Sequence, residues 1–369
     1  MIPDKLAWRF PKAEKPASIP GSDWDDWKWQ VRNMLRTPEA IAKRFSLSKE
    51  HEDSIRSAQG RFLAGMTPYY ASLIEKVDDP IGLQAIPQKK ELDSNPDECA
   101  DPLTEERYSP QRLIVHKYPD RLLLYASNIC ATYCRHCTRK QKNFDSCQPA
   151  GKELEDAIGY IRDRTEIRDV VISGGDPLLL EDSRLERILD EVSSISHVEI
   201  IRIHTRAPVT LPQRITESLT SMLEKYRPLY LNAQFNHPKE CTFESYIASE
   251  RLREAGCILG NQMVLLKGVN DDPPIVEELN HKLLMMGIKP YYIFHCDKNL
   301  GNTHLRTSLE TGLGVIRHLG RTSGLAVPHY IMDSPYGKIT LGPDDILRKE
   351  GDTYHLRTRD GGIYQYKEV

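Results

Sequence analysis

The chain of 369 residues contains no hydrophobic run long enough to cross a membrane. A transmembrane helix needs about 20 consecutive apolar residues, whereas the hydrophobic 39% of this sequence is spread over short stretches. The first residues also lack the apolar core of a secretory signal peptide. We therefore expect a cytoplasmic protein with no membrane partner.

An excess of positive charge is missing as well. The formal net charge is −3, from 50 Lys and Arg residues against 53 Asp and Glu residues. Nucleic-acid-binding proteins usually carry a basic excess or a basic stripe, so we expect no nucleic-acid partner. The length and the 28% of charged residues are typical of a globular protein with a sizeable core.

A disulfide framework is not indicated, because most of the cysteines stand alone. Five of the eight cysteines have no close neighbour of their kind: Cys99, Cys147, Cys241, Cys257 and Cys296. Disulfide scaffolds instead concentrate cysteines in a short chain. We expect these five to be free thiols.

The other three cysteines form a compact motif. Cys130, Cys134 and Cys137 have the spacing Cys-x3-Cys-x2-Cys, and no fourth cysteine stands nearby in register. A [4Fe–4S] cluster takes four thiolates, so three would leave one iron open, as catalytic zinc sites keep an open position. A zinc site with further Cys or His ligands and a redox disulfide are the alternatives, although the nearest histidine, His136, lies between Cys134 and Cys137, where neighbouring ligands would crowd.

The N-terminal region predicts helices. Ser22 is placed to cap a helix whose apolar residues recur three and four positions apart: Trp24, Trp27, Val31, Met34 and Leu35. Residues 78–112 are rich in Asp, Pro, Glu and Lys, which indicates an extended linker. We expect a helical N-terminal region and a wrapping linker over residues 1–111.

From about residue 120, short apolar runs alternate with amphipathic segments. The runs lie at 122–126, 170–172, 198–203, 229–235, 258–266, 291–296 and 326–332, and helical segments at 153–164, 183–194, 215–225, 243–255 and 275–286. Repeated βα units predict a parallel sheet. Six or so units predict an α/β fold with a full or partial barrel over residues 112–340. In residues 341–369, two alternating runs around Arg-Asp-Gly-Gly-Ile predict a β-hairpin.

Functional residues of such barrels gather at the C-terminal ends of the strands. The cysteine motif follows the first predicted strand, and Ser173, Gly174, Gly175 and Asp176 follow the second. Adjacent glycines let a backbone approach a ligand closely, although a plain turn capped by Asp176 is the alternative. Because the turn and the cysteines share one end of the barrel, we favour a binding role.

Four charged residues belong to the same end. Lys338, beside a glycine after the last strand, is a candidate for a covalent bond to pyridoxal phosphate, although most lysines are solvent-exposed. Asp297 and Asp333 end two strands, where they can bind a cationic group or pair with nearby Arg and Lys residues. Arg139 is a candidate receptor for a carboxylate. Together they would suit a basic amino acid.

From about Asp79 to the C-terminus, the sequence resembles the lysine 2,3-aminomutase family of radical SAM enzymes. The resemblance rests on Cys-Arg-His-Cys-Thr-Arg at 134–139, Asp-Pro-Leu-Thr-Glu-Glu-Arg-Tyr-Ser-Pro from Asp101, Phe-Asn-His-Pro from Phe235 and Leu-Leu-Lys-Gly-Val-Asn-Asp from Leu265. It implies a partial (βα)6 radical SAM barrel with a helical N-terminal extension and a short C-terminal β-hairpin segment. It also implies an isomerase that converts L-lysine to β-lysine.

The resemblance implies three cofactors. A [4Fe–4S] cluster would be held by Cys130, Cys134 and Cys137 and would bind S-adenosylmethionine at its open iron. Residues 173–176 would hold the methionyl amino group. Lys338 would hold pyridoxal 5′-phosphate, with Tyr118 and Arg121 helping to seat it.

For the substrate, the resemblance implies that Arg139 binds the carboxylate and that Asp297 and Asp333 bind the distal ammonium. Arginine is the nearest alternative substrate, and a glutamate enzyme should lack the acid pair. A non-catalytic iron–sulfur protein and a radical SAM enzyme without pyridoxal phosphate are further alternatives. An external one-electron donor such as flavodoxin or ferredoxin is expected.

The sequence departs from the family at two places. Longer members carry structural zinc, but Asp272 stands at the first ligand position and no cysteine follows Cys296. We therefore expect no zinc, and a homo-oligomer would need other contacts. Only Ser-Pro-Tyr-Gly separates Asp333 from Lys338, where the family has a longer glycine run, so two residues are missing and Tyr336 intrudes. Either the loop is tightened or the cofactor sits differently.

Overall fold

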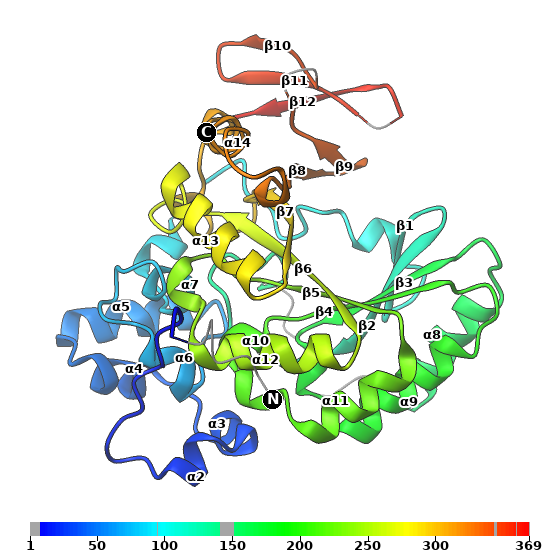
Figure 1. The fold of residues 1–369 in the computed structure, drawn as a ribbon. Helices are drawn as coiled ribbons and strands as arrows, with labels where there is room; N and C mark the ends of the chain where they lie inside the picture. Colours follow the sequence, from blue (N-terminus) through cyan, green and yellow to red (C-terminus); the bar gives the residue numbers. More distant parts are fainter. Residues whose placement is uncertain (1–7, 94, 141–150, 343–344, 359, 369) are drawn as a thin grey trace.

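The computed structural model describes residues 8–93, 95–140, 151–342, 345–358 and 360–368 (Figure 1). Its centre is a nine-stranded sheet in which β1 to β9 follow one another in chain order. Seven strands run parallel: β2 (Arg121–Ser127), β3 (Asp169–Gly174), β4 (Ile200–His204), β5 (Leu229–Ala233), β6 (Cys257–Leu265), β7 (Lys289–His295) and β8 (His329–Ser334). The antiparallel strands β1 (Ile114–Tyr118) and β9 (Gly337–Thr340) flank them.

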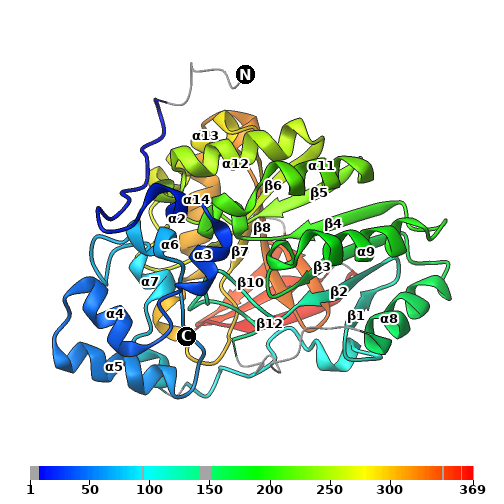
Figure 2. The same cartoon turned by 90° about the horizontal axis from the view of Figure 1, so that it is seen from below.

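Helices connect the parallel strands and cover the outside of the curved sheet (Figure 2). In chain order they are α8 (Lys152–Arg162), α9 (Asp182–Ser193), α11 (Glu217–Leu223), α12 (Phe243–Glu254), α13 (Pro273–Met285) and α14 (Leu309–Leu319), and the short α10 (Ala207–Thr210) precedes α11. They pack through apolar stripes; α9, for example, buries Leu185, Ile188, Leu189 and Val192. This confirms the predicted partial barrel, and α14 is an element that was not predicted. None of the described helices is long and apolar enough to span a membrane.

The N-terminal region is helical, as predicted, and lies to one side of the barrel (Figure 1). Its helices are α2 (Gly21–Trp24), α3 (Trp27–Arg32), α4 (Pro38–Phe45), α5 (Lys49–Gln59), α6 (Pro68–Ser72) and α7 (Gly82–Ala85). The single helix predicted to start at Ser22 is wrong. The first helix, α2, ends before Asp25. A second helix, α3, then begins, because the Asp26 carboxylate accepts a hydrogen bond from the Lys28 amide at 2.8 Å and caps its N-terminus.

The C-terminal segment forms a small separate sheet. The predicted hairpin is confirmed by β11 (Thr353–Arg357) and β12 (Ile363–Lys367), and β10 (Ile346–Glu350) adds a third strand. His295 joins this sheet to the barrel, because its ring shares hydrogen bonds with the Tyr366 and Tyr330 hydroxyls at 2.9 and 2.8 Å. The sheet therefore packs beside the ends of β7 and β8.

Candidate functional site

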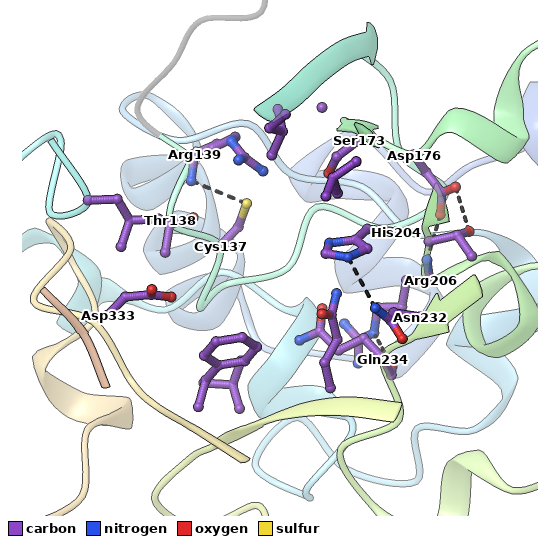
Figure 3. A pocket seen from close by; sticks show the side chains of 18 of the residues that line it. Cys137, Thr138, Arg139, Ser173, Asp176, His204, Arg206, Asn232, Gln234 and Asp333 are labelled. Atoms are coloured by element: carbon purple, nitrogen blue, oxygen red, sulfur yellow. Dashed lines mark hydrogen bonds between the residues drawn. The ribbon is translucent and has the colours of Figure 1, made fainter. Parts of the chain in front are cut away.

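The C-terminal ends of the parallel strands surround a cavity of about 360 Å³ (Figure 3). Every candidate residue from the sequence lines it: Tyr118, Arg121, Cys130, Cys134, Cys137, Arg139, Ser173, Gly174, Gly175, Asp176, Asp297, Asp333 and Lys338. Parallel strands place the residues that follow them at one edge of the sheet. The structure thus brings together residues that are more than 200 positions apart in the sequence.

The cysteine loop is anchored to the N-terminal region. The Tyr133 amide donates to the Gly65 carbonyl at 2.9 Å. Arg135 forms two hydrogen bonds to Glu91 at 2.9 and 2.6 Å, and both side chains are almost fully buried. An unpaired charge at such a depth would be strongly destabilising. The ion pair therefore fixes the loop between its second and third cysteines.

The three thiols line one cavity. Within the described ranges, however, no three Cys, His, Asp or Glu side chains are arranged to hold a metal ion. Burial, and then the nearby Asp176 carboxylate and the other two thiols, raise the pKa of Cys130 well above its usual range. Burial and Cys134 likewise raise the pKa of Cys137. Metal binding to thiols displaces their protons, so this thiol set is compatible with a cluster that binds with proton release. The other cysteines of the described residues are also free thiols, and Cys147 lies outside those residues.

Arg206 adds a positive charge to the cysteine loop. Its Nη1 lies 2.8 Å from the Cys134 sulfur, and its Nη2 donates to the Glu240 carboxylate at 2.7 Å. Arg206 is 8% exposed. A cationic donor beside a thiolate offsets negative charge, so this position fits a cluster ligand.

The Ser-Gly-Gly-Asp turn packs directly on the cysteine loop. A Cβ at Gly174 would collide with the Ser127 carbonyl oxygen, and one at Gly175 with the Ile129 carbonyl oxygen. The Gly175 amide donates to the Ser127 carbonyl at 2.7 Å. The glycines are therefore required for close backbone packing, a reason that the sequence alone does not give.

Asp176 serves as the cap of the turn. Its carboxylate accepts hydrogen bonds from the Leu178 amide at 3.1 Å, the Thr205 hydroxyl at 2.6 Å and the Arg206 amide at 2.8 Å. Burial raises the pKa of Asp176. The carboxylate is engaged with the protein, as the alternative interpretation of the turn predicted, while the residue also lines the cavity.

At another part of the cavity, the two candidate acids lie close to a lysine. Lys338 Nζ donates to both oxygens of Asp333, at 2.8 and 2.9 Å. Burial, followed by the neighbouring Asp333 carboxylate, raises the pKa of Asp297 to about 8, while Lys338 and Lys117 act in the opposite direction. Asp333 therefore already binds one primary ammonium, and Asp297 lies in the same cavity.

The loop between Asp333 and Lys338 is a tight hairpin. Ser334 of β8 pairs with Gly337 of β9, so the shortened loop expected from the sequence is confirmed. Tyr336, which stands in this shortened loop, does not line the cavity: it is 67% exposed, and its ring lies 6.4 Å from that of Tyr364. The two-residue turn points the tyrosine outward.

Tyr118 and Arg121 lie next to this hairpin. The Tyr118 hydroxyl accepts a hydrogen bond from the Lys338 amide at 3.0 Å. The Arg121 guanidinium lies over the Tyr118 ring, 4.2 Å from its centroid. A phenol and a cation beside a lysine are groups that can hold an anionic aromatic cofactor.

Arg139 is not isolated in the cavity wall. Its Nη2 donates to Glu105 Oε1 at 2.6 Å, and its Nε donates to the Tyr125 hydroxyl at 2.8 Å. The Glu105 carboxylate raises the pKa of Arg139 well above its usual range, against the effect of burial. The guanidinium thus stays charged.

Sequence reasoning missed several residues that line the cavity. Glu105 belongs to the motif that starts at Asp101, but no role followed from the motif. Lys117 donates to the Ser334 carbonyl at 2.6 Å, and burial lowers its pKa. His204 ends β4, Asn232 lies one residue before the end of β5, and the two share a hydrogen bond at 3.2 Å. A polar residue at the end of an apolar strand was the available signal for the last two.

Known proteins match this chain over nearly its whole length. A family model described as the radical SAM superfamily matches residues 124–277. The chain is 44% identical over 355 residues to the L-lysine 2,3-aminomutase of Methanococcus maripaludis, which covers 94% of this chain and 82% of that protein. It is also 44% identical over 357 residues to the L-lysine 2,3-aminomutase of Clostridium subterminale, covering 95% and 86%.

A relative with a different named substrate is nearly as similar. The chain is 41% identical over 352 residues to the glutamate 2,3-aminomutase of Clostridioides difficile, covering 94% of this chain and 83% of that protein. The names of these relatives share one reaction and differ in the amino acid. The chain belongs to the lysine 2,3-aminomutase family of radical SAM enzymes.

Proposed function

We propose that the protein is an L-lysine 2,3-aminomutase, an isomerase that moves the amino group of lysine from C2 to C3 to give β-lysine. The observation that supports lysine is the acid pair. Asp297 and Asp333 follow or end adjacent parallel strands and line the same cavity, and Asp333 already holds the primary ammonium of Lys338. A site built for the side-chain carboxylate of glutamate would instead need a cation at this position.

The family membership implies a [4Fe–4S] cluster, S-adenosylmethionine and pyridoxal phosphate, which supply hydrogen abstraction by a radical and migration of an amino group when they are bound. In this proposal three thiolates hold the cluster and leave one iron for S-adenosylmethionine: those of Cys130, Cys134 and Cys137. The turn of residues 173–176 holds the methionyl amino group through its backbone and Ser173.

Lys338 would hold pyridoxal phosphate through a covalent bond, and Tyr118 and Arg121 would help to seat this cofactor. Asp333, which accepts both hydrogen bonds of the Lys338 ammonium, would accept the ammonium of the substrate in its place.

Arg139 binds the carboxylate of the substrate, and Asp297 and Asp333 bind its other end. The two acids disfavour neutral side chains, because a carboxylate in the cavity wall that loses its cationic partner is destabilised. Fixing both ends of a flexible amino acid orients the carbons between them, which is the main contribution that a protein makes to such a reaction.

We also propose that the enzyme works in the cytoplasm, receives electrons from a flavodoxin or ferredoxin, and forms a homo-oligomer without structural zinc. The free thiols of the described residues suit a reducing compartment.

Arginine is the second candidate substrate, because its guanidinium is also a cation that two carboxylates can bind.

The test is an anaerobic assay of the reconstituted protein with S-adenosylmethionine, dithionite and one amino acid at a time. We expect lysine to give the highest kcat/KM, arginine to react less well and glutamate not to react. Preferential turnover of glutamate would refute the role of the acid pair. Turnover of none of the amino acids by protein that carries its cluster would refute the proposed function.

A further inference from the structure

Glu105, which has no role so far, holds Arg139 together with Tyr125. Arg139 Nη2 donates to Glu105 Oε1 at 2.6 Å, and Arg139 Nε lies 3.3 Å from Glu105 Oε2. The Arg139 Nε also donates to the Tyr125 hydroxyl at 2.8 Å, and this hydroxyl donates to Glu105 Oε2 at 2.6 Å. The three side chains therefore form a closed ring of hydrogen bonds.

The ring lies in the wall of the cavity and is shielded from water. Glu105 is 5% exposed, and the Arg139 side chain is 15% exposed. Both residues line the cavity, and the Arg139 guanidinium also lies 5.0 Å from the centroid of the Tyr125 ring. Hydrogen bonds between ionised groups are stronger at such sites than in water. The guanidinium is thus held in one orientation before any substrate arrives.

This orientation leaves one edge of the guanidinium available. A guanidinium has five N–H donors, and Glu105 and Tyr125 engage those on the Nε and Nη2 side. Within the described residues, Arg139 Nη1 has no hydrogen-bond partner. Nη1 and the second N–H of Nη2 form a fork that matches the two oxygens of a carboxylate.

We propose that Glu105 is the positioning residue of the carboxylate receptor. It occupies one edge of Arg139 and thereby presents the other edge to the carboxylate of the amino acid. The inference rests on the proposed role of Arg139 as that receptor. Without Glu105, the long arginine side chain would have to be ordered by the substrate, which costs affinity.

The test compares Glu105→Gln with the unchanged enzyme in two measurements. The KM for lysine should rise about tenfold or more, because a charge-assisted contact is replaced by a neutral one. The second measurement is inhibition by 1,5-diaminopentane, which has the two amino groups of lysine and no carboxylate. Its inhibition constant should stay the same, because it cannot use Arg139.

A matched control breaks another arginine–carboxylate pair. Asp182 accepts a hydrogen bond from Arg214 at 2.6 Å, and neither residue lines the cavity. Asp182→Asn should leave both constants unchanged. Tyr125→Phe keeps Glu105 and should shift the KM for lysine in the same direction by a smaller factor. It provides the test if Glu105→Gln fails to fold.

The outcomes separate this inference from the proposed function. If Arg139→Lys leaves the KM for lysine unchanged, the receptor role itself is wrong. If Arg139→Lys raises this KM while Glu105→Gln and Tyr125→Phe do not, only the positioning role is overturned. Equal weakening of lysine and 1,5-diaminopentane would mean that Glu105 supports the cavity in general, which also overturns the inference.

Discussion

Replacing Asp297 by asparagine tests whether the acid pair binds the distal ammonium of the substrate. The pKa of about 8 means that about a tenth of the Asp297 carboxyl groups are ionised at pH 7 and about nine-tenths at pH 9. Only the ionised form favours a cation. We therefore expect kcat/KM for lysine to rise about tenfold over this range.

The size of the loss follows from the hydrogen bond that asparagine cannot replace. A hydrogen bond between charged groups contributes about 1.5–3 kcal/mol, which is about 10- to 150-fold in kcat/KM. This full loss is expected at pH 9, where Asp297 is ionised. At pH 7 the loss should be about tenfold smaller, because the unchanged enzyme must first release the proton.

The assay measures initial rates of β-lysine formation from pH 7 to pH 9 for the unchanged enzyme, Asp297→Asn and the control Asp163→Asn. Asp163 is an exposed residue at the end of α8 and should have no effect. The ratio of the two kcat/KM values removes pH effects that arise elsewhere. A ratio that is close to one at pH 9, or that is the same at pH 7 and pH 9, would refute the reasoning.

Three further outcomes are expected. Cys134→Ala should lose the iron and the brown absorbance after reconstitution; full iron content would show that this thiol is not a cluster ligand. Borohydride should trap pyridoxal phosphate on Lys338, and a peptide map with the adduct on another lysine would contradict this assignment. Gly175→Ala should lower the free energy of unfolding by about 1–3 kcal/mol in urea denaturation, because its Cβ would collide with the Ile129 carbonyl. Gly159→Ala, on a helix with open space around it, should not be destabilising, and equal effects of the two changes would contradict the packing argument.

The barrel could be predicted because its strands are short apolar runs, whereas most of its helices are longer segments in which apolar residues recur on one face. The unpredicted helix α14 contains Gly312 and Gly314, and glycine disfavours helices. A Cβ at Gly312 would collide with the Tyr330 ring, so this glycine allows α14 to pack closely on β8. The prediction of one continuous N-terminal helix was wrong for a local reason. Asp26 caps a new helix at a point where the spacing of the apolar residues continues without a break.

Much of the candidate site could be predicted because the three cysteines, residues 173–176, Asp297 and Asp333 follow or end strands of a parallel sheet. The side chains that pair with these residues could not be predicted. Glu105 precedes Arg139 by 34 positions in a segment without a clear period, and only the path of the chain brings the two together. The same holds for Glu91 and Arg135, which are 44 positions apart. Such pairings depend on tertiary packing, which one sequence does not reveal.

The central claim is that the enzyme moves the α-amino group of lysine to the neighbouring carbon. Incubation of the reconstituted protein with S-adenosylmethionine, dithionite and lysine labelled with ¹⁵N at the α-amino group tests it directly. We expect β-lysine that carries the label on C3, detected by NMR and mass spectrometry. Cluster-loaded protein that leaves the label on C2, or that releases it to solvent, would contradict the account.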